Sequence, residues 1–299
     1  MVAGARPQDQ TARAYAHCEA IARAHYENFP VASLLLPAAM RRHIAAIYAF
    51  ARAADDFADE PGLETAERLR RLDDWRARFD AAVARATPAA SSDGRDLVFV
   101  ALADTIRQHR LPPSLFEDLL SAFRQDVTTT RYATWTEVLD YCRRSANPVG
   151  RLVLRVAGYD DPRLDRASDA VCTALQLTNF WQDLARDWSI GRVYVPADDR
   201  NHAGARDEDL AAGRMTPEWR RVMAQMTGRT RALFAEGRAV CDGVRGRLRW
   251  ELRLTWLGGS KILDKLEHAG FDVFRHRPTL GKQDLPGLVR DAVLWRRRG

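Results

Sequence analysis

The stretch from Tyr48 to Asp59 places three carboxylates in an otherwise apolar, helix-forming run. On a helix, Asp55 and Asp59 share one face because they are four residues apart. Asp56 lies beside them, and Arg52 and Tyr48 precede them by one and two turns. Carboxylates at this spacing repel each other by about 0.2–0.5 kcal/mol, so a bound cation is a natural compensation. Taken alone, the pattern is more often that of a solvated acidic face.

A second stripe of oxygen-bearing side chains occurs further along the chain. Asn179, Asp183 and Asp187 step by four residues, and Gln176 precedes them by about one turn. Two such helices facing a common cleft could hold Mg²⁺, because this ion prefers hard carboxylate and amide oxygens and a diphosphate completes its coordination. The two stripes together favour a cation-dependent enzyme over a plain acidic surface.

The composition is that of a globular, helical protein. Hydrophobic residues make up 46% of the 299 positions, and no alternating run of strand length stands out, which favours an all-α fold. The formal charge of +6 rests on Arg, since Lys is almost absent. This charge suits nucleic acid, an anionic membrane surface or a phosphorylated substrate. Nucleic acid is the least supported of these, because no zinc-finger or RNP-like motif is present.

The cysteine pattern and the absence of long apolar runs indicate the compartment. The four cysteines form no CxxC pair, so we expect neither structural zinc nor a disulfide framework. No apolar run has the length of a signal peptide at the N-terminus or of a membrane span elsewhere. We expect a cytoplasmic protein, and peripheral contact with the inner face of the membrane stays open.

Helices must position the two stripes, and proline and capping residues mark where those helices begin and end. Pro37 opens the helix of the first stripe and Pro61-Gly62 ends it, while the second stripe follows on a helix from about Leu164. Further helices are expected over residues 11–28, 64–86, 96–109, 216–245 and 251–268, the last interrupted near Gly258-Gly259, with a loop over residues 87–94. We expect a single domain over residues 1–299, with a core of about residues 11–285.

Two capping boxes mark further helix starts. They are Ser114 with Glu117, and Thr134 with Glu137. Thr216, followed by Pro217, is a third predicted cap. The helix that begins at Thr134 contains Pro148, which lacks a backbone donor and should kink it.

Further motifs accompany the two stripes in a specific order. They are His25 with Phe29, Tyr141-Cys142, Val149-Gly150 and Arg192–Pro196. With both stripes, these motifs resemble the squalene/phytoene synthase family of head-to-head prenyl synthases over nearly the whole chain. Residues 27–33, 145–150 and 179–183 look most like the hopanoid-pathway branch called HpnC, the hydroxysqualene synthases.

The resemblance implies a fold and a reaction. The fold would be the all-α isoprenoid-synthase fold, with a central cavity flanked by the two Asp-rich helices. The substrate would be presqualene diphosphate, a cyclopropylcarbinyl diphosphate made from two farnesyl diphosphates by a sister enzyme. Ionisation, rearrangement and capture of the cation by water would give hydroxysqualene, so Mg²⁺ is the expected cofactor and NADPH is not expected. Enzymes of the hopanoid pathway would be the functional neighbours.

The same resemblance implies roles for individual residues. The metal ligands would be Asp55, Asp56, Asp59, Asn179, Asp183 and Asp187. The catalytic residues would be Tyr48, Tyr141 and Arg52. The substrate-binding residues would be His25, Phe29, Arg52, Gln176, Asn179, Arg192, Tyr194 and Phe271. Arg suits the diphosphate oxygens because its planar donor fork matches phosphate.

Two departures from the family pattern concern diphosphate contacts. Gln182 stands where phytoene- and dehydrosqualene-type relatives often have Arg, and Phe271 stands where they often have Tyr. These changes fit a different substrate or half-reaction.

Other functions stay open. A sister enzyme would condense two farnesyl diphosphates to presqualene diphosphate, squalene or dehydrosqualene, which the shared motifs do not distinguish. A non-catalytic helical scaffold is a different class of protein, but it would be expected to lose the carboxylates that this chain keeps.

Overall fold

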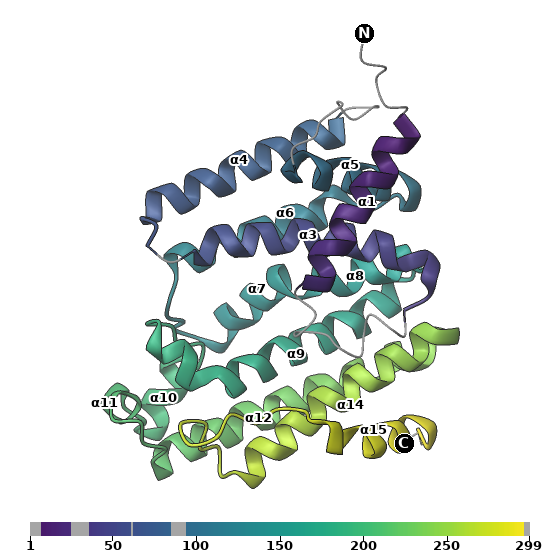
Figure 1. The fold of residues 1–299 in the computed structure, drawn as a ribbon. Coiled ribbons are helices and arrows are strands. Elements are labelled where there is room, and N and C mark those ends of the chain that lie inside the picture. Colours follow the sequence, from purple (N-terminus) through teal and green to yellow (C-terminus); the bar gives the residue numbers. More distant parts are fainter. Residues whose placement is uncertain (1–6, 25–35, 61, 85–93, 296–299) are drawn as a thin grey trace. The chain divides into compact units, whose positions relative to one another are not determined.

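The computed structural model of the chain describes residues 7–24, 36–60, 62–84 and 94–295 (Figure 1). Within these ranges the regular structure is helical, apart from one isolated parallel bridge between Arg131 and Val193. The predicted all-α class is therefore confirmed. None of the helices in these ranges combines the length and the hydropathy of a membrane-spanning segment.

The chain divides into two compact units. Unit 1 contains Met1–Thr128 and Arg151–Asp160, and unit 2 contains Thr129–Gly150 and Asp161–Gly299. The boundary falls inside helix α8 (Asn147–Val156), so this helix contributes residues to both units. The expectation of a single domain over residues 1–299 stays a prediction.

Unit 1 has an aromatic core centred on α3. Its principal helices are α1 (Pro7–Ala24), α3 (Ala38–Asp59), α4 (Thr65–Ala84), α5 (Gly94–His109) and α6 (Pro113–Thr128). Phe50 of α3 is fully buried, and its ring centroid lies 5.9 Å from that of Trp75, 5.4 Å from that of Phe79 and 5.5 Å from that of Phe116. Because α3 buries this face, its charged residues fall on the opposite side of the helix.

A buried polar cluster joins α1, α3 and α5. The Tyr15 hydroxyl lies 2.8 Å from Asp104 Oδ2, 3.0 Å from Thr105 Oγ1 and 3.1 Å from His43 Nδ1. The other ring nitrogen of His43 accepts a hydrogen bond from Arg42 Nε at 3.2 Å. With only 2% of its surface exposed, His43 has its polar atoms satisfied within the protein, as burial requires.

Unit 2 is built around α9 (Pro162–Ser189). Asp161 caps this helix by accepting a hydrogen bond from the Arg163 backbone N–H at 2.8 Å, and Pro162 follows at the first position. Helix α12 (Pro217–Gly237) packs along α9, and a Cβ on Gly237 would lie 2.6 Å from the Ala167 carbonyl oxygen. The remaining elements of unit 2 are α7 (Trp135–Ser145), α10 (Ala197–Ala203), α11 (Asp207–Ala211), α13 (Ala239–Gly243), α14 (Gly246–His268), η2 (Lys282–Asp284) and α15 (Leu285–Val293).

Two predicted caps are confirmed and one is wrong. Thr134 and Thr216 each accept a hydrogen bond from the backbone N–H three residues later, as expected. The box at Ser114 is wrong because α6 already begins at Pro113, which leaves Ser114 inside the first turn. Proline suits that position since the first helical N–H has no partner in any case.

Three predicted helices have different bounds in the structure. The helix opened by Thr134 does not bend at Pro148 but ends at Ser145, and α8 begins at Asn147. The helix predicted over residues 216–245 ends at Gly237, and α13 follows it. The interruption predicted at Gly258-Gly259 is absent, because α14 runs unbroken through both glycines.

The glycines of α14 have a packing role. A Cβ on Gly259 would lie 2.5 Å from the Phe234 ring and 2.7 Å from Leu175. The missing side chain therefore lets α14 approach α12 and α9 closely. The loop predicted over residues 87–94 lies, except for Gly94, outside the described residues.

Candidate active site

The acidic stripe of α3 is partly neutralised by an arginine on the same helix. Arg52 Nη2 lies 2.6 Å from Asp56 Oδ1, and its Nη1 lies 3.5 Å from Asp55 Oδ2. Both carboxylates are about half exposed, and Asp59 is exposed at the end of the helix. The first stripe thus presents solvent-accessible carboxylates beside one guanidinium, the donor set predicted from the sequence.

Tyr48 and Arg52 each place a buried polar atom on this face. Neither the Tyr48 hydroxyl nor Arg52 Nε has a hydrogen-bond partner within the described residues. Burial raises the pKa of the Tyr48 phenol above its ordinary value, although nearby Arg52 opposes this shift. Buried groups of this kind usually gain partners from a ligand or an ordered water. The predicted contact of these two atoms with a substrate would satisfy them, and it stays a prediction.

A cavity of about 210 Å³ adjoins Arg52 within unit 1. It is lined by residues of α1, α3, α4 and α5: His17, Ile21, Ala49, Arg52, Ala53, Asp56, Trp75, Gly94, Arg95 and Val98. The Arg52–Asp56 pair therefore reaches both the acidic stripe and this small cavity.

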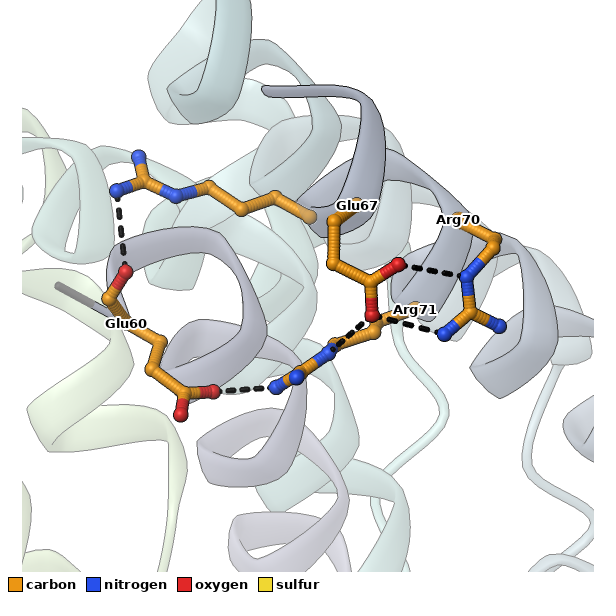
Figure 2. Close-up of polar contacts among 5 residues, drawn as sticks. Glu60, Glu67, Arg70 and Arg71 are labelled. Carbon is orange, nitrogen blue, oxygen red and sulfur yellow. Dashed lines mark hydrogen bonds and ion pairs between the residues drawn. The ribbon is translucent and has the colours of Figure 1, made fainter. Parts of the chain in front are cut away.

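Charged contacts fix the end of α3 just beyond Asp59 (Figure 2). Arg71 of α4 reaches Glu60 Oε2 at 2.5 Å and Glu67 Oε1 at 2.9 Å, and Arg70 Nε reaches Glu67 Oε2 at 2.7 Å. The hydrogen bonds from Arg70 and Arg71 lower the pKa of Glu67 to about 2. This network joins α4 to the residue that follows Asp59, which limits movement of the last turn of the stripe.

The stripe of α9 contains a contact that sequence reasoning missed. Arg277 donates from Nε to Asp183 Oδ1 at 2.5 Å and from Nη2 to Oδ2 at 2.9 Å. The carboxylate of Asp183 raises the pKa of Arg277, and Asp187 adds to the same effect. A two-pronged contact of this kind is the strongest pairing that an arginine makes with a carboxylate. Asp183 therefore already holds a cationic partner.

Gln182 anchors the segment that carries Arg277. Its side-chain amide is buried and donates to the Pro278 carbonyl oxygen. Lys265 Nζ donates to the next carbonyl, that of Thr279, at 2.8 Å. Gln182, the departure noted in the sequence, thus has a structural role in which it holds the backbone beside Arg277.

Arg192 follows α9 in a short extended loop. Its backbone N–H donates to the Asp187 carbonyl at 2.8 Å, and the Val193 N–H donates to the Thr130 carbonyl at 2.9 Å. Both bonds keep the backbone of Arg192 beside the last aspartate of the stripe. The acceptor of the Arg192 N–H is the backbone carbonyl of Asp187, not its carboxylate.

Tyr141 and Tyr194 lie together in an aromatic cluster of unit 2. The Phe180 and Tyr194 rings stack with centroids 3.6 Å apart, and Tyr141 lies 5.9 Å from Phe180 and 6.0 Å from Tyr194. Tyr132 completes the cluster, 5.6 Å from Tyr194. All four rings are buried. Such faces are electron-rich and would stabilise a cation that came against them.

Phe271, three residues after the end of α14, has an unusual backbone conformation. Its φ is +61°, directly after Gly270 at +59°, and its side chain is buried. A bulky residue rarely adopts this left-handed conformation. This turn lies between α14 and the segment that carries Arg277, and the predicted contact of Phe271 with substrate stays a prediction.

The remaining predicted residues are placed as follows. Gln176 is half-buried and Asn179 is exposed on α9. His25 and Phe29 lie outside the described residues. The acidic residues of the first stripe belong to unit 1 and those of the second to unit 2, so their service in one common site stays a prediction.

The donor chemistry of the two stripes suits Mg²⁺, an ion that does not require a cage built by the protein alone. Within the described ranges, no group of three or more His, Cys, Asp or Glu side chains lies close enough to hold a metal. Mg²⁺ usually binds through only one or two carboxylates and takes its other ligands from phosphates and water. Asp55, which is about half exposed, and Asp183, which is about a quarter exposed, each lie beside a guanidinium and fit that requirement.

Known proteins resemble this chain over most of its length. The family model described as squalene/phytoene synthase matches residues 22–284. A hydroxysqualene synthase of Sinorhizobium fredii is 35% identical over 261 residues, which cover 87% of this chain and 85% of that protein. The hydroxysqualene synthase of Rhodopseudomonas palustris is 36% identical over 243 residues, 81% of this chain and 80% of that protein.

A solved structure is also similar to this chain, both in sequence and in fold. The crystal structure of squalene synthase HpnC from Alicyclobacillus acidocaldarius superimposes with a TM-score of 0.80 at 40% identity, over 87% of this chain and 95% of that one. The likeness confirms the fold expected from the sequence motifs.

Proposed function

Because the chain belongs to the squalene/phytoene synthase family, we propose that it is a hydroxysqualene synthase, which converts presqualene diphosphate and water to hydroxysqualene and diphosphate. Two relatives that it matches over most of their length bear that name, which supports the choice of reaction. The observation that carries the proposal is the pairing of Asp183 with Arg277, because it gives the second stripe both a carboxylate for a metal and a guanidinium for a diphosphate.

In the proposed reaction the bond between the cyclopropylcarbinyl carbon and the diphosphate oxygen breaks, and its electron pair leaves with the diphosphate. The cation rearranges, a water oxygen forms the new carbon–oxygen bond, and the water gives up one proton. Cleavage of the bond to the diphosphate is the difficult step, because negative charge develops on the leaving group. Donors aimed at those oxygens lower its barrier, and each one typically contributes a factor of about 10²–10³ in rate.

The arginines would bind the leaving group. Arg52 and Arg277 carry guanidinium groups beside the two stripes, and Arg192 is held next to Asp187. We assign diphosphate contacts to all three, because a planar donor fork matches phosphate oxygens.

The carboxylates would hold Mg²⁺. Asp55, Asp59, Asp183 and Asp187, with Asn179 and Asp56 beside them, supply hard oxygen donors. The bound ion would supply neutralising charge at the diphosphate. With the ion bound, Arg277 would leave Asp183 and donate to the diphosphate instead. The same guanidinium would thus neutralise Asp183 in the empty site and the diphosphate in the occupied site.

The aromatic residues would protect the cation. The buried rings of Tyr141, Tyr194 and Phe180 present electron-rich faces in a dry environment. The Tyr48 hydroxyl, buried without a protein partner within the described residues, would face the reacting centre.

Product analysis tests the proposal. The purified full-length protein is incubated with Mg²⁺ and either presqualene diphosphate or farnesyl diphosphate, with and without NADPH, and the products are identified by mass spectrometry. We expect hydroxysqualene from presqualene diphosphate, independent of NADPH. Squalene, dehydrosqualene or presqualene diphosphate formed from farnesyl diphosphate would assign the chain to a sister reaction. No turnover of either substrate would favour the scaffold alternative.

A further inference from the structure

Two charged side chains hold the backbone that follows Arg277, in a segment without regular structure. Lys265 of α14 donates from Nζ to the Thr279 carbonyl oxygen at 2.8 Å. The Gly281 backbone N–H donates to Asp284 Oδ2 at 2.7 Å. Both contacts fall within four residues of Arg277, so they fix the chain close to the guanidinium of the second stripe.

Lys265 and Asp284 also pair with each other. Lys265 Nζ lies 2.6 Å from Asp284 Oδ2, the same oxygen that accepts the Gly281 N–H. The Asp284 side chain is only 8% exposed. The Gly281 N–H and then the Lys265 ammonium hold the pKa of Asp284 below its ordinary value, so the carboxylate stays charged. This ion pair therefore fixes the Thr279 carbonyl and the Gly281 N–H relative to each other and to α14.

The same segment is held against α9 and packs on α14. The buried amide of Gln182, on α9, donates to the Pro278 carbonyl oxygen. Leu280 lies over Gly258 of α14, where an added Cβ would come within 3.1 Å of Leu280 Cδ1. Residues 278–281 thus have contacts on both helices, and the Lys265–Asp284 pair is the charged part of them.

The position of this backbone decides where the Arg277 guanidinium lies. Arg277 donates to both oxygens of Asp183, at 2.5 and 2.9 Å, and such a two-pronged contact requires the two planar groups to be aligned. A long arginine side chain has many rotamers, so a fixed backbone limits which of them reach the carboxylate. Misplacement of a charge-stabilising group by about 1 Å can lower a rate by about 10²-fold.

We propose that Lys265 and Asp284 are positioning residues for Arg277. They hold the backbone from which its guanidinium reaches Asp183 in the ligand-free protein and the diphosphate of a bound substrate. Both act on main-chain atoms, so the side-chain torsions of Arg277 can still change between these two partners. The inference rests on the proposed function, because that function assigns Arg277 to the diphosphate.

The Nε–H resonance of Arg277 tests the proposal without metal or substrate. In the full-length protein prepared with ¹⁵N-labelled arginine, it is the resonance that Arg277→Gln removes. Lys265→Met keeps the length of the side chain but removes the ammonium, and it should displace this resonance from its wild-type position or abolish it. Lys265→Arg keeps a charged donor and should preserve it.

Lys261→Met is the matched control, because Lys261 is an exposed lysine one turn earlier on α14. It should leave the Arg277 resonance in place. Asp284→Asn is a second variant that keeps an oxygen for the Gly281 N–H but lacks the charge that holds Lys265. It should displace the resonance as Lys265→Met does. Circular dichroism identifies any variant that fails to fold.

A double-mutant cycle separates positioning from a general structural role. With presqualene diphosphate as substrate, Lys265→Met should lower kcat by roughly tenfold and leave KM nearly unchanged, since Arg277 acts on the leaving group in the transition state. In the Arg277→Gln background the same change should have no further effect on kcat, because the group that Lys265 positions is gone.

Two results would overturn the proposal. One is an Arg277 resonance that stays at its wild-type position in folded Lys265→Met, or that is already absent from the wild type. The other is a loss of kcat in Lys265→Met that is equally large with and without Arg277. If presqualene diphosphate is not turned over, the proposed function fails, but the resonance still decides whether Lys265 positions Arg277.

Discussion

Arg277 and Asp183 form a two-pronged ion pair although they are 94 residues apart in the sequence. The guanidinium engages both carboxylate oxygens, so a metal ion that uses Asp183 has to share or displace it. The pair therefore connects the binding of metal to the position of Arg277.

The Arg277→Gln variant should separate the effect of Arg277 on metal binding from its effect on turnover. In Arg277→Gln, the competing positive charge is lost, so Mn²⁺ should bind the substrate-free protein several-fold more tightly. Turnover should fall by about 10²-fold, because one donor to the leaving group is gone. Mn²⁺ binding is followed by electron paramagnetic resonance and turnover by product formation.

Arg275→Gln is the control for this variant, since Arg275 is a highly exposed arginine that pairs with Asp272 instead. Its Mn²⁺ affinity and turnover should match the wild type. Equal behaviour of the two variants would show that Arg277 has no special part in the site.

The carboxylates of both stripes should be needed for turnover. Asp55→Asn and Asp183→Asn keep the size of the side chain but remove its charge, so each should lower turnover by about 10²-fold or more while circular dichroism stays unchanged. Asp74→Asn, on an exposed carboxylate of α4 that pairs with Arg78, is the control and should be neutral. Near-normal turnover in either stripe variant would contradict the metal-binding role of that stripe.

Gly150 should tolerate no side chain. A Cβ there would lie 2.3 Å from Ser168 Oγ and 2.5 Å from Cys172 Sγ, so Gly150→Ala should destabilise the protein by about 1–3 kcal/mol in urea unfolding. The matched change Gly228→Ala is also in a helix, but its Cβ meets nothing within 4 Å. It should stabilise by about 0.5–1 kcal/mol, because Ala is the better helix former. Equal effects of the two changes would refute this packing argument.

Stability should fall in mild acid because of His43. Burial, followed by the neighbouring His109 and Arg42, lowers the pKa of His43 from 6.5 to about 4. Above pH 6.5 the ring is neutral in both folded and unfolded chains. Between pH 6.5 and 4 only the unfolded chain takes up the proton, so the free energy of unfolding decreases as pH falls, by about 1–3 kcal/mol in total.

Urea unfolding at a series of pH values measures this dependence. His43→Gln should be less stable at pH 7, since its hydrogen bonds change, but should lose part of the slope between pH 6.5 and 4. His202→Gln, a change at an exposed histidine, should keep the full slope. A slope that is identical in all three proteins would exclude His43 as its source.

The sequence was sufficient to predict most of the helices and the two stripes of oxygen-bearing side chains. Pro37 and Thr216-Pro217 lie where α3 and α12 begin, because caps and first-turn prolines act locally. The start of α9 was predicted at about Leu164, whereas the helix begins two residues earlier, at Pro162. The error at Ser114 has the same local origin, since two helix-start signals overlap there and Pro113 prevails. The unbroken course of α14 depends instead on packing, which compensates the low helix propensity of Gly258-Gly259.

The site was predictable only where its residues lie on a periodic element. Asp183 belongs to a stripe of a helix, so a metal-binding role could be proposed for it from spacing. Arg277 lies in a segment without regular structure, far along the chain, and no local pattern distinguishes it from the other arginines. Gln182 suggested only a changed diphosphate contact, whereas its hydrogen bond to Pro278 depends on how the chain returns after α14.

The division of the chain into units restricts how the protein can be dissected and synthesised. The first unit is interrupted by Thr129–Gly150 and completed only by Arg151–Asp160. A fragment that stops at Thr128 would lack the last ten residues of that unit, and no single cut yields both units whole. On the ribosome, the first unit is therefore complete only after part of the second has emerged, so maturation of the two is interleaved rather than sequential.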